Sequence, residues 1–221
     1  MKKGLSNIVS KSDLSQSLEV IVKDELERLD KVKSVSVFSS NDILSCPRKL
    51  HYRSIKVSKD DTGIEGFNHK CAVRKWRELL NYYVVGEDMV LADCNYNIVS
   101  LGAIMIEIDH VKILLEVQSV SNDDFESILL NGAHKKDVVK LMVNEWLAEV
   151  ERGLLIYENR NDFRFEIFQV HPYSPIIKSI KTRCEDLMKC NSTGALPDRP
   201  YKDSNMKECN SCAYSIECWA N

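Results

Sequence analysis

The clearest pattern in the chain is a pair of β-rich segments that flank two polar residues. Residues 98–108 and 111–118 are dense in Ile, Leu and Val, and Asp109-His110 stands between them. Such runs, broken by a short polar pair, predict an antiparallel hairpin whose turn is Asp109-His110. Because side chains alternate between the faces of a strand, the turn also sets the register, and it places Glu116 opposite Ala103.

Helical spacing of apolar residues predicts helices on both sides of this hairpin. Residues 12–31 have apolar positions three and four apart, and residues 135–152 repeat that pattern along one face. The remaining predicted elements are a helix capped by residues 39–42 that carries residues 46–53, helices at 68–83 and 174–189, strands at 154–157 and 163–170, and a connector at 194–204. One small sheet interrupted by helices predicts an α/β fold class.

Composition and charge narrow the class of protein. The chain is 44% hydrophobic and 29% charged, as in ordinary soluble globular proteins, and its net charge is −3. This charge gives no general attraction to nucleic acid, so any such binding needs a local basic patch. No run of apolar residues is long enough to cross a membrane, and the first residues do not form the apolar stretch of a signal peptide. We therefore expect a cytoplasmic protein with no membrane partner.

The eight cysteines are unevenly placed, and three of them end the chain. Cys209, Cys212 and Cys218 form a C-x2-C-x5-C array. In a reducing cytosol these thiols predict metal ligation rather than disulfides. A four-cysteine site needs one more thiolate, and Cys46, which begins a basic helical segment, is the best-placed candidate. Four thiolates suit an iron–sulfur cluster and also structural zinc, so the sequence leaves zinc open as the alternative.

Taken together, these motifs resemble a known family. The segment Ser45-Cys46-Pro47-Arg48-Lys49-Leu50-His51-Tyr52 precedes a helix with a lone His69, a hairpin with a Glu-x-Lys-like second strand, a connector at 196–201 and the terminal cysteine array. This combination resembles the RecB-like, CRISPR-associated exonucleases and, more closely, phage-encoded relatives in the PD-(D/E)XK nuclease superfamily. The resemblance runs from about residue 37 to Trp219. It implies a 4Fe-4S cluster and cleavage of DNA ends, typically single-stranded, with Mg²⁺ or Mn²⁺.

The resemblance also implies an organisation of the chain. It predicts a restriction-endonuclease-like core with a helical N-terminal part and a cysteine-rich C-terminal segment that forms an iron–sulfur domain. The expected parts are a helical extension at 1–36, a helical region with the first cluster cysteine and a basic patch at 37–95, the nuclease core at 96–190, and the connector with the cluster segment at 191–221. A phage-encoded member would act in the cytoplasm of its host.

The catalytic residues of the family carry over only in part. His69 and Glu116 match the family's metal-binding His and Glu, whereas Gln118 stands where a Lys is expected. The expected Asp corresponds to Ala103, because Asp109 could reach the metal beside Glu116 only from a strongly bulged strand. On the next helix Lys140 and Asn144 replace a Gln and a Tyr, and Lys140 could supply the missing positive charge. The catalytic candidates are thus Glu116, Gln118 and Lys140, and the divalent-metal candidates are His69, Glu116 and Asp109.

Basic residues beside Cys46 are the candidate contacts to DNA. Arg48, Lys49 and Arg53 could follow a phosphate backbone, with Tyr52 stacking on a base. Further cations follow on the next predicted helix at Lys70, Arg74, Lys75 and Arg77. Three functions fit the sequence: an exonuclease with an altered metal site, a non-cleaving member that binds DNA or a protein of CRISPR adaptation, recombination or phage replication, and an unrelated protein held together by zinc.

Overall fold

The computed structural model of the chain describes residues 37–55 and 64–220. The predicted helix at 12–31, like the whole extension at 1–36, lies outside the described residues. Residues Phe38–Asn221 form one compact unit. No helix in the described part of the chain has the length and apolar character that a membrane span requires.

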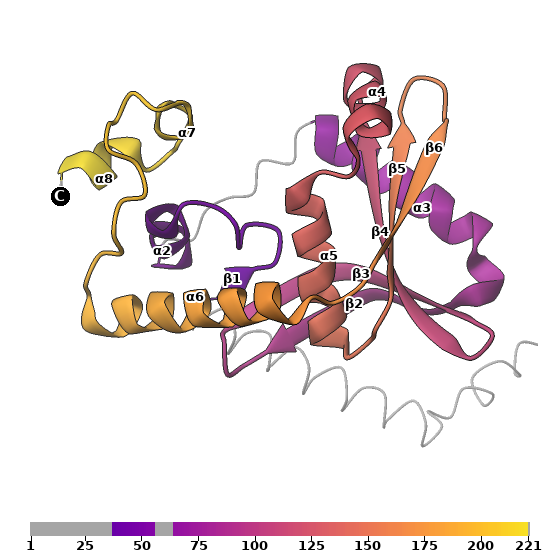
Figure 1. The fold of residues 1–221 in the computed structure, drawn as a ribbon, viewed down its shortest axis with the longest axis horizontal. Helices are drawn as coiled ribbons and strands as arrows, with labels where there is room; N and C mark the ends of the chain where they lie inside the picture. Colours follow the sequence, from indigo (N-terminus) through magenta and orange to yellow (C-terminus); the bar gives the residue numbers. More distant parts are fainter. Residues whose placement is uncertain (1–36, 56–63, 221) are drawn as a thin grey trace, which may run out of the picture. The chain divides into compact units, whose positions relative to one another are not determined.

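A mixed six-stranded sheet lies at the centre of this unit, as Figure 1 shows. Its strands are β1 (Phe38–Ser39), β2 (Val84–Asp93), β3 (Ile98–Ile108), β4 (Val111–Val120), β5 (Gly153–Asn159) and β6 (Phe165–Val170). They are ordered β1-β3-β4-β5-β6, with β2 also paired to β3. The α/β class is confirmed, and the sheet draws on residues that precede position 96.

The predicted hairpin and its turn are confirmed. Strands β3 and β4 are antiparallel, and Ile108 pairs with Val111 directly across Asp109-His110. Both turn residues have positive φ, 51° and 64°, which is the backbone of a two-residue turn whose twist matches that of the flanking strands. The ladder continues to the pair Ile104–Leu115, so Ala103 and Glu116 are the next residues along the two strands.

Helices cover both faces of the sheet. Helices α4 (Asn122–Asn131) and α5 (Lys135–Ala148) form the crossover between the parallel strands β4 and β5. Leu141 of α5 packs on Leu114 and Leu155. Helix α3 (Ile64–Leu79) covers the other face, where Trp76 packs near Leu115 and Val117. Alternate residues of β4 therefore face different helices.

A second cluster of buried side chains joins the ends of the described chain. Helix α6 (Ser174–Thr193) packs against α2 (Pro47–Ile55), with Leu50, Ile180 and Leu187 in a shared core. The short helices α7 (Lys207–Asn210) and α8 (Ser215–Ala220) follow α6. This arrangement brings the terminal cysteine array next to α2.

Several boundaries differ from the prediction. Strand β2 and helix α4 were not predicted; the first residues of β2 are mixed in polarity, and α4 is short. The capping residues at 39–42 were assigned wrongly, because α2 begins at Pro47, a residue that favours the first helical turn. Helix α5 ends at Ala148 rather than at 152, since Glu149 takes a left-handed conformation with φ 54°.

Candidate functional site

The site begins with a local opening in the central sheet. Gly102 has φ +77° and forms a bulge, since the neighbours Met89 and Val90 of β2 pair with Ala103 and Leu101. A side chain with a Cβ rarely adopts this φ, so glycine suits the position. Beyond this bulge β3 and β4 separate, and a cleft of about 420 Å³ opens beside Glu116.

Glu116 is buried on the wall of this cleft and is held by two neighbours. Its Oε1 atom accepts a hydrogen bond from Gln118 Nε2 at 2.8 Å and lies 2.5 Å from Lys140 Nζ of helix α5. The Glu116 side chain is 9% exposed and that of Lys140 is 18% exposed. An ion pair so shielded from water is screened much less than one on the surface. The three predicted catalytic residues are therefore brought together as an internal network.

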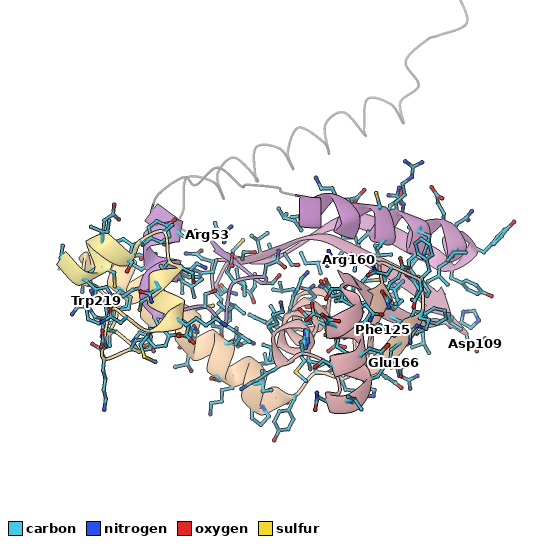
Figure 2. The ribbon with its side chains drawn as sticks, turned by 90° about the horizontal axis from the view of Figure 1, so that it is seen from above. Arg53, Asp109, Phe125, Arg160, Glu166 and Trp219 are labelled. Atoms are coloured by element: carbon cyan, nitrogen blue, oxygen red, sulfur yellow. The ribbon has the colours of Figure 1, made fainter. Side chains whose placement is uncertain are left out.

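Asp109, a predicted ligand of the divalent metal, does not join this network. Ala103 lines the cleft beside Glu116 and supplies no ligand atom. Asp109 lies in the turn, and Figure 2 shows it at the outer tip of the hairpin, roughly 20 Å along the strand from the level of Glu116 at ~3.3 Å per residue. His69 falls within α3, but its side chain lies outside the described part of the structure.

Three cations of helix α3 line the same cleft. Lys70, Arg74 and Arg77 lie four and three residues apart, which places them along one side of the helix. Arg74 pairs with Glu78 at 2.9 Å, and Arg77 contacts Glu87 at 3.1 Å. Lys70 is exposed. Arg74, like Lys70, is open to water, whereas Arg77 is partly buried.

The sequence analysis missed a second carboxylate near the network. Asp137 lies one helical turn before Lys140 and lines a small pocket with Gln118 and Lys140. It accepts a hydrogen bond from the hydroxyl of Tyr157 at 2.8 Å. Burial and this carboxylate both raise the pKa of Tyr157, so the phenol stays protonated and keeps donating to Asp137. In the sequence, the three-residue spacing of Asp137 and Lys140 indicates that both side chains lie on the same side of the predicted helix.

The four predicted cluster cysteines line one pocket. Cys46, Cys209, Cys212 and Cys218 surround a space of about 330 Å³ between α2 and the terminal helices, and all four are free thiols. In the described part of the chain, no three His, Cys, Asp or Glu side chains are arranged closely enough to hold a metal ion. The structure therefore gathers the predicted donors around one space without bringing them to ligating distance.

The other cysteines differ from these four in their surroundings. Cys71 and Cys94 are exposed, and Cys190 lines a separate groove along α6. Cys184 is fully buried, and burial raises the pKa of its thiol to about 12. Since metals bind the thiolate, Cys184 is unsuited to ligation.

The predicted DNA contacts on α2 have partners within the protein. Arg48 donates to the carbonyls of Pro197 and Cys218, at 2.7 and 3.0 Å. Tyr52 is buried and stacks on Tyr214, with ring centroids 5.7 Å apart. Arg53 forms an ion pair with Asp42. Lys49 lines the cysteine pocket. Arg48 and Tyr52 thus face the C-terminal segment, and the row on α3 is the more accessible basic surface.

Comparison with solved structures shows which known proteins have a similar fold. No protein-family model matches the chain, and no curated protein matches it. Among solved structures, the alkaline exonuclease LHK-Exo from Laribacter hongkongensis matches with a TM-score of 0.57 at 8% identity, over 72% of this chain and 90% of that one.

Two further structures agree with this match. LHK-Exo in complex with dAMP matches with a TM-score of 0.57 at 6% identity, over 74% of this chain and 91% of that one. The protein SSO0001 matches with a TM-score of 0.58 at 18% identity, over 93% of this chain and 97% of that one. Structural similarity at such low sequence identity shows a shared fold and no more. The chain has a mixed α/β fold of the kind found in an alkaline exonuclease, so the expected nuclease-like fold is confirmed.

Proposed function

We propose that this protein binds DNA in the cleft beside Glu116 and cleaves it poorly or not at all. One observation carries the proposal. Ala103 lies next to Glu116, where the resemblance leads us to expect an Asp, and Glu116 forms an ion pair with Lys140. The nuclease-like fold supports the choice of DNA as ligand. The expected preference for single strands, and a role in CRISPR adaptation, recombination or phage replication, belong to this proposal.

The ion pair explains why cleavage should be weak. Mg²⁺ prefers six oxygen ligands in octahedral geometry and sheds water reluctantly. Here Glu116 is the carboxylate that faces the cleft from β4, and the Lys140 ammonium already neutralises it at 2.5 Å. Asp88 of β2 also lines the cleft, but its side chain is 80% exposed and lies 3.6 Å from Arg77. A metal would have to displace this lysine and leave an ammonium group in a largely buried place, which is costly. Gln118 adds no charge that could stabilise a reacting phosphate.

Binding without cleavage needs only the cations of the cleft. Lys70 and Arg74 can contact phosphates through their side chains, and each contact releases counterions from the nucleic acid. Phosphate contacts of this kind do not depend on the base sequence. We therefore expect weak, salt-dependent binding that is insensitive to sequence.

The first test reverses the charge of the cleft. In the variant with Lys70→Glu and Arg74→Glu, affinity for a single-stranded oligonucleotide should fall about tenfold or more at 0.1 M salt. The slope of log affinity against log salt should flatten by about 1.4, or ~0.7 for each lost phosphate contact. Fluorescence anisotropy over a salt series measures both quantities.

The matched control places the same two changes on another helix. Lys178 and Lys189 are exposed cations of α6 that line a different groove. The variant with Lys178→Glu and Lys189→Glu should bind almost as the unaltered protein does. Equal losses in both variants would mean that binding follows overall charge, and the assignment of DNA to the cleft would then be wrong.

We further propose that Cys46, Cys209, Cys212 and Cys218 hold a 4Fe-4S cluster, with zinc as the alternative. The shared pocket and the all-thiol donor set suit such a group. Trp219 lines the pocket too, and its buried Nε1 has no acceptor among the described residues, a donor that a cluster sulfur could satisfy. Binding requires the four side chains to close in on the pocket. When bound, the cluster would cross-link α2 to the end of the chain.

The metal content of purified protein tests this second proposal. Anaerobically purified protein should be brown, with a broad absorption near ~400 nm from thiolate-to-iron charge transfer, and should contain iron and sulfide. Replacing any one of the four cysteines by Ser should bleach the colour, whereas Cys71→Ser should not. Colourless protein with one equivalent of zinc would show that the site holds zinc and not an iron–sulfur cluster.

A further inference from the structure

Two arginines converge on a single backbone carbonyl in the C-terminal segment. Arg48 Nη1 donates to the carbonyl of Cys218 at 3.0 Å, and Arg199 Nη2 donates to the same oxygen at 2.8 Å. Hydrogen bonds from charged donors are stronger than those between neutral groups. A carbonyl oxygen has two lone pairs, so both bonds can form at once. Cys218 is thereby fixed from helix α2 and from the connector together.

Each arginine also makes a second contact that fixes its own position. Arg48 Nε donates to the carbonyl of Pro197 at 2.7 Å, so its planar guanidinium bridges the connector and the end of the chain. The Arg199 guanidinium lies 4.7 Å from the ring centroid of Trp219. Such a cation over an indole face is attracted by the ring electrons. Figure 2 shows Trp219 in this terminal segment.

These contacts join the same two segments of the chain that the proposed cluster would join, α2 and the C-terminal segment. The Arg48 bonds join residues 149 and 170 positions apart, and Tyr52 donates to the carbonyl of Glu217 across 165 positions. Each of these contacts is made between protein groups.

We propose that Arg48 and Arg199 are positioning residues that hold the C-terminal cysteine segment on α2 through the carbonyl of Cys218, whether or not a cluster is bound. Cluster loss then leaves Cys218 beside the other three thiols, so the site can be reloaded without refolding of the segment. The role of Cys218 as a cluster ligand rests on the proposed function, whereas the contacts of Arg48 and Arg199 with it do not.

Proteolysis of metal-free full-length protein tests the proposal. Chymotrypsin cleaves after tyrosine, and Tyr201 lies in the connector between α6 and α7 in every variant. Metal-free protein, prepared by oxidation and chelation, should resist cleavage at Tyr201 as well as loaded protein does. Arg48→Ala and Arg199→Ala should each speed this cleavage by about tenfold, and the double variant should speed it further.

Two further variants separate positioning from general loss of stability. Arg48→Lys keeps the charge but cannot bridge two carbonyls with one planar group, so its cleavage rate should fall between those of the unaltered protein and Arg48→Ala. Arg164→Ala removes an arginine that pairs with Glu126 and Asp162 far along the chain, and cleavage at Tyr201 should not change.

The outcomes distinguish this inference from the cluster proposal. If metal-free unaltered protein is cut as fast as the double arginine variant, the cluster rather than the arginines holds the segment, and the inference is overturned. It is overturned equally if the double variant resists cleavage as the unaltered protein does. A protein that never binds iron would refute the cluster alone, because the comparison of the unaltered protein with the arginine variants uses metal-free protein throughout.

Discussion

Three side-chain changes in the cleft beside Glu116 should strongly raise the metal-dependent nuclease activity of this protein. The variant combines Ala103→Asp, Gln118→Lys and Lys140→Gln. It adds a second carboxylate beside Glu116, frees Glu116 from the ammonium at 2.5 Å and supplies a new cation from β4. Because charge stabilisation of this kind contributes about 10²–10³-fold, we expect cleavage at least ~100-fold above the unaltered protein. End-labelled single-stranded oligonucleotides with Mn²⁺ or Mg²⁺ measure it.

The three changes are needed together for a physical reason. Lys140→Gln alone would leave Glu116 buried at 9% exposure without its ion-pair partner, which destabilises a protein strongly. Gln118→Lys keeps a positive charge beside the cleft, and Ala103→Asp gives a metal a second carboxylate, so the buried charges stay balanced when Lys140 is replaced. Adding Glu116→Gln to the triple variant should abolish the gained activity. A triple variant that folds and binds Mn²⁺ but shows no cleavage dependent on Glu116 would contradict this assignment of the site.

The second large effect concerns Glu145, a fully buried carboxyl group of α5. Neither of its oxygens has a hydrogen-bond partner among the described residues, and the side chain packs where Gly153 leaves room for it. Burial raises its pKa from 4.5 to about 7. Below about pH 4.5 the group is protonated in both the folded and the unfolded protein. Between pH 4.5 and 7 the unfolded protein loses this proton first, so folding stability falls as the pH rises.

Glu145→Gln should remove this pH dependence. The shift corresponds to roughly 3 kcal/mol of unfolding free energy, fully lost above about pH 7. The Gln variant should therefore be more stable than the unaltered protein at pH 8 and no more stable at pH 4.5. Urea unfolding at both pH values measures the difference, with the exposed Glu151→Gln as control. An equal effect of Glu145→Gln at the two pH values would show that Glu145 does not titrate in this window.

The hairpin that carries the site was predictable because its information is local. Two aliphatic runs and one polar pair determine the turn, and the turn determines the register that places Ala103 beside Glu116. The same reasoning excluded Asp109 from the neighbourhood of Glu116. The register that sets Ala103, rather than a carboxylate, opposite Glu116 was therefore predictable from the sequence.

The rest of the site depends on contacts between distant segments, which periodicity does not reveal. Lys140 reaches Glu116 only because α5 returns across β4, and Asp137 comes with it. Arg48 and Tyr52 contact the C-terminal segment, and nothing local in the sequence shows that this segment lies against them. Strand β2 was missed because Gly86, Glu87 and Asp88 interrupt its apolar residues.

The central claim, binding without efficient cleavage, is tested most directly by the unaltered protein under single-turnover conditions. Protein in excess is incubated with an end-labelled single-stranded oligonucleotide and Mn²⁺ or Mg²⁺, and binding and product formation are followed in the same samples. We predict that the oligonucleotide is bound and remains intact. Rapid cleavage that Glu116→Ala abolishes would contradict the account, because it would show that Glu116 holds a catalytic metal despite Ala103 and Lys140.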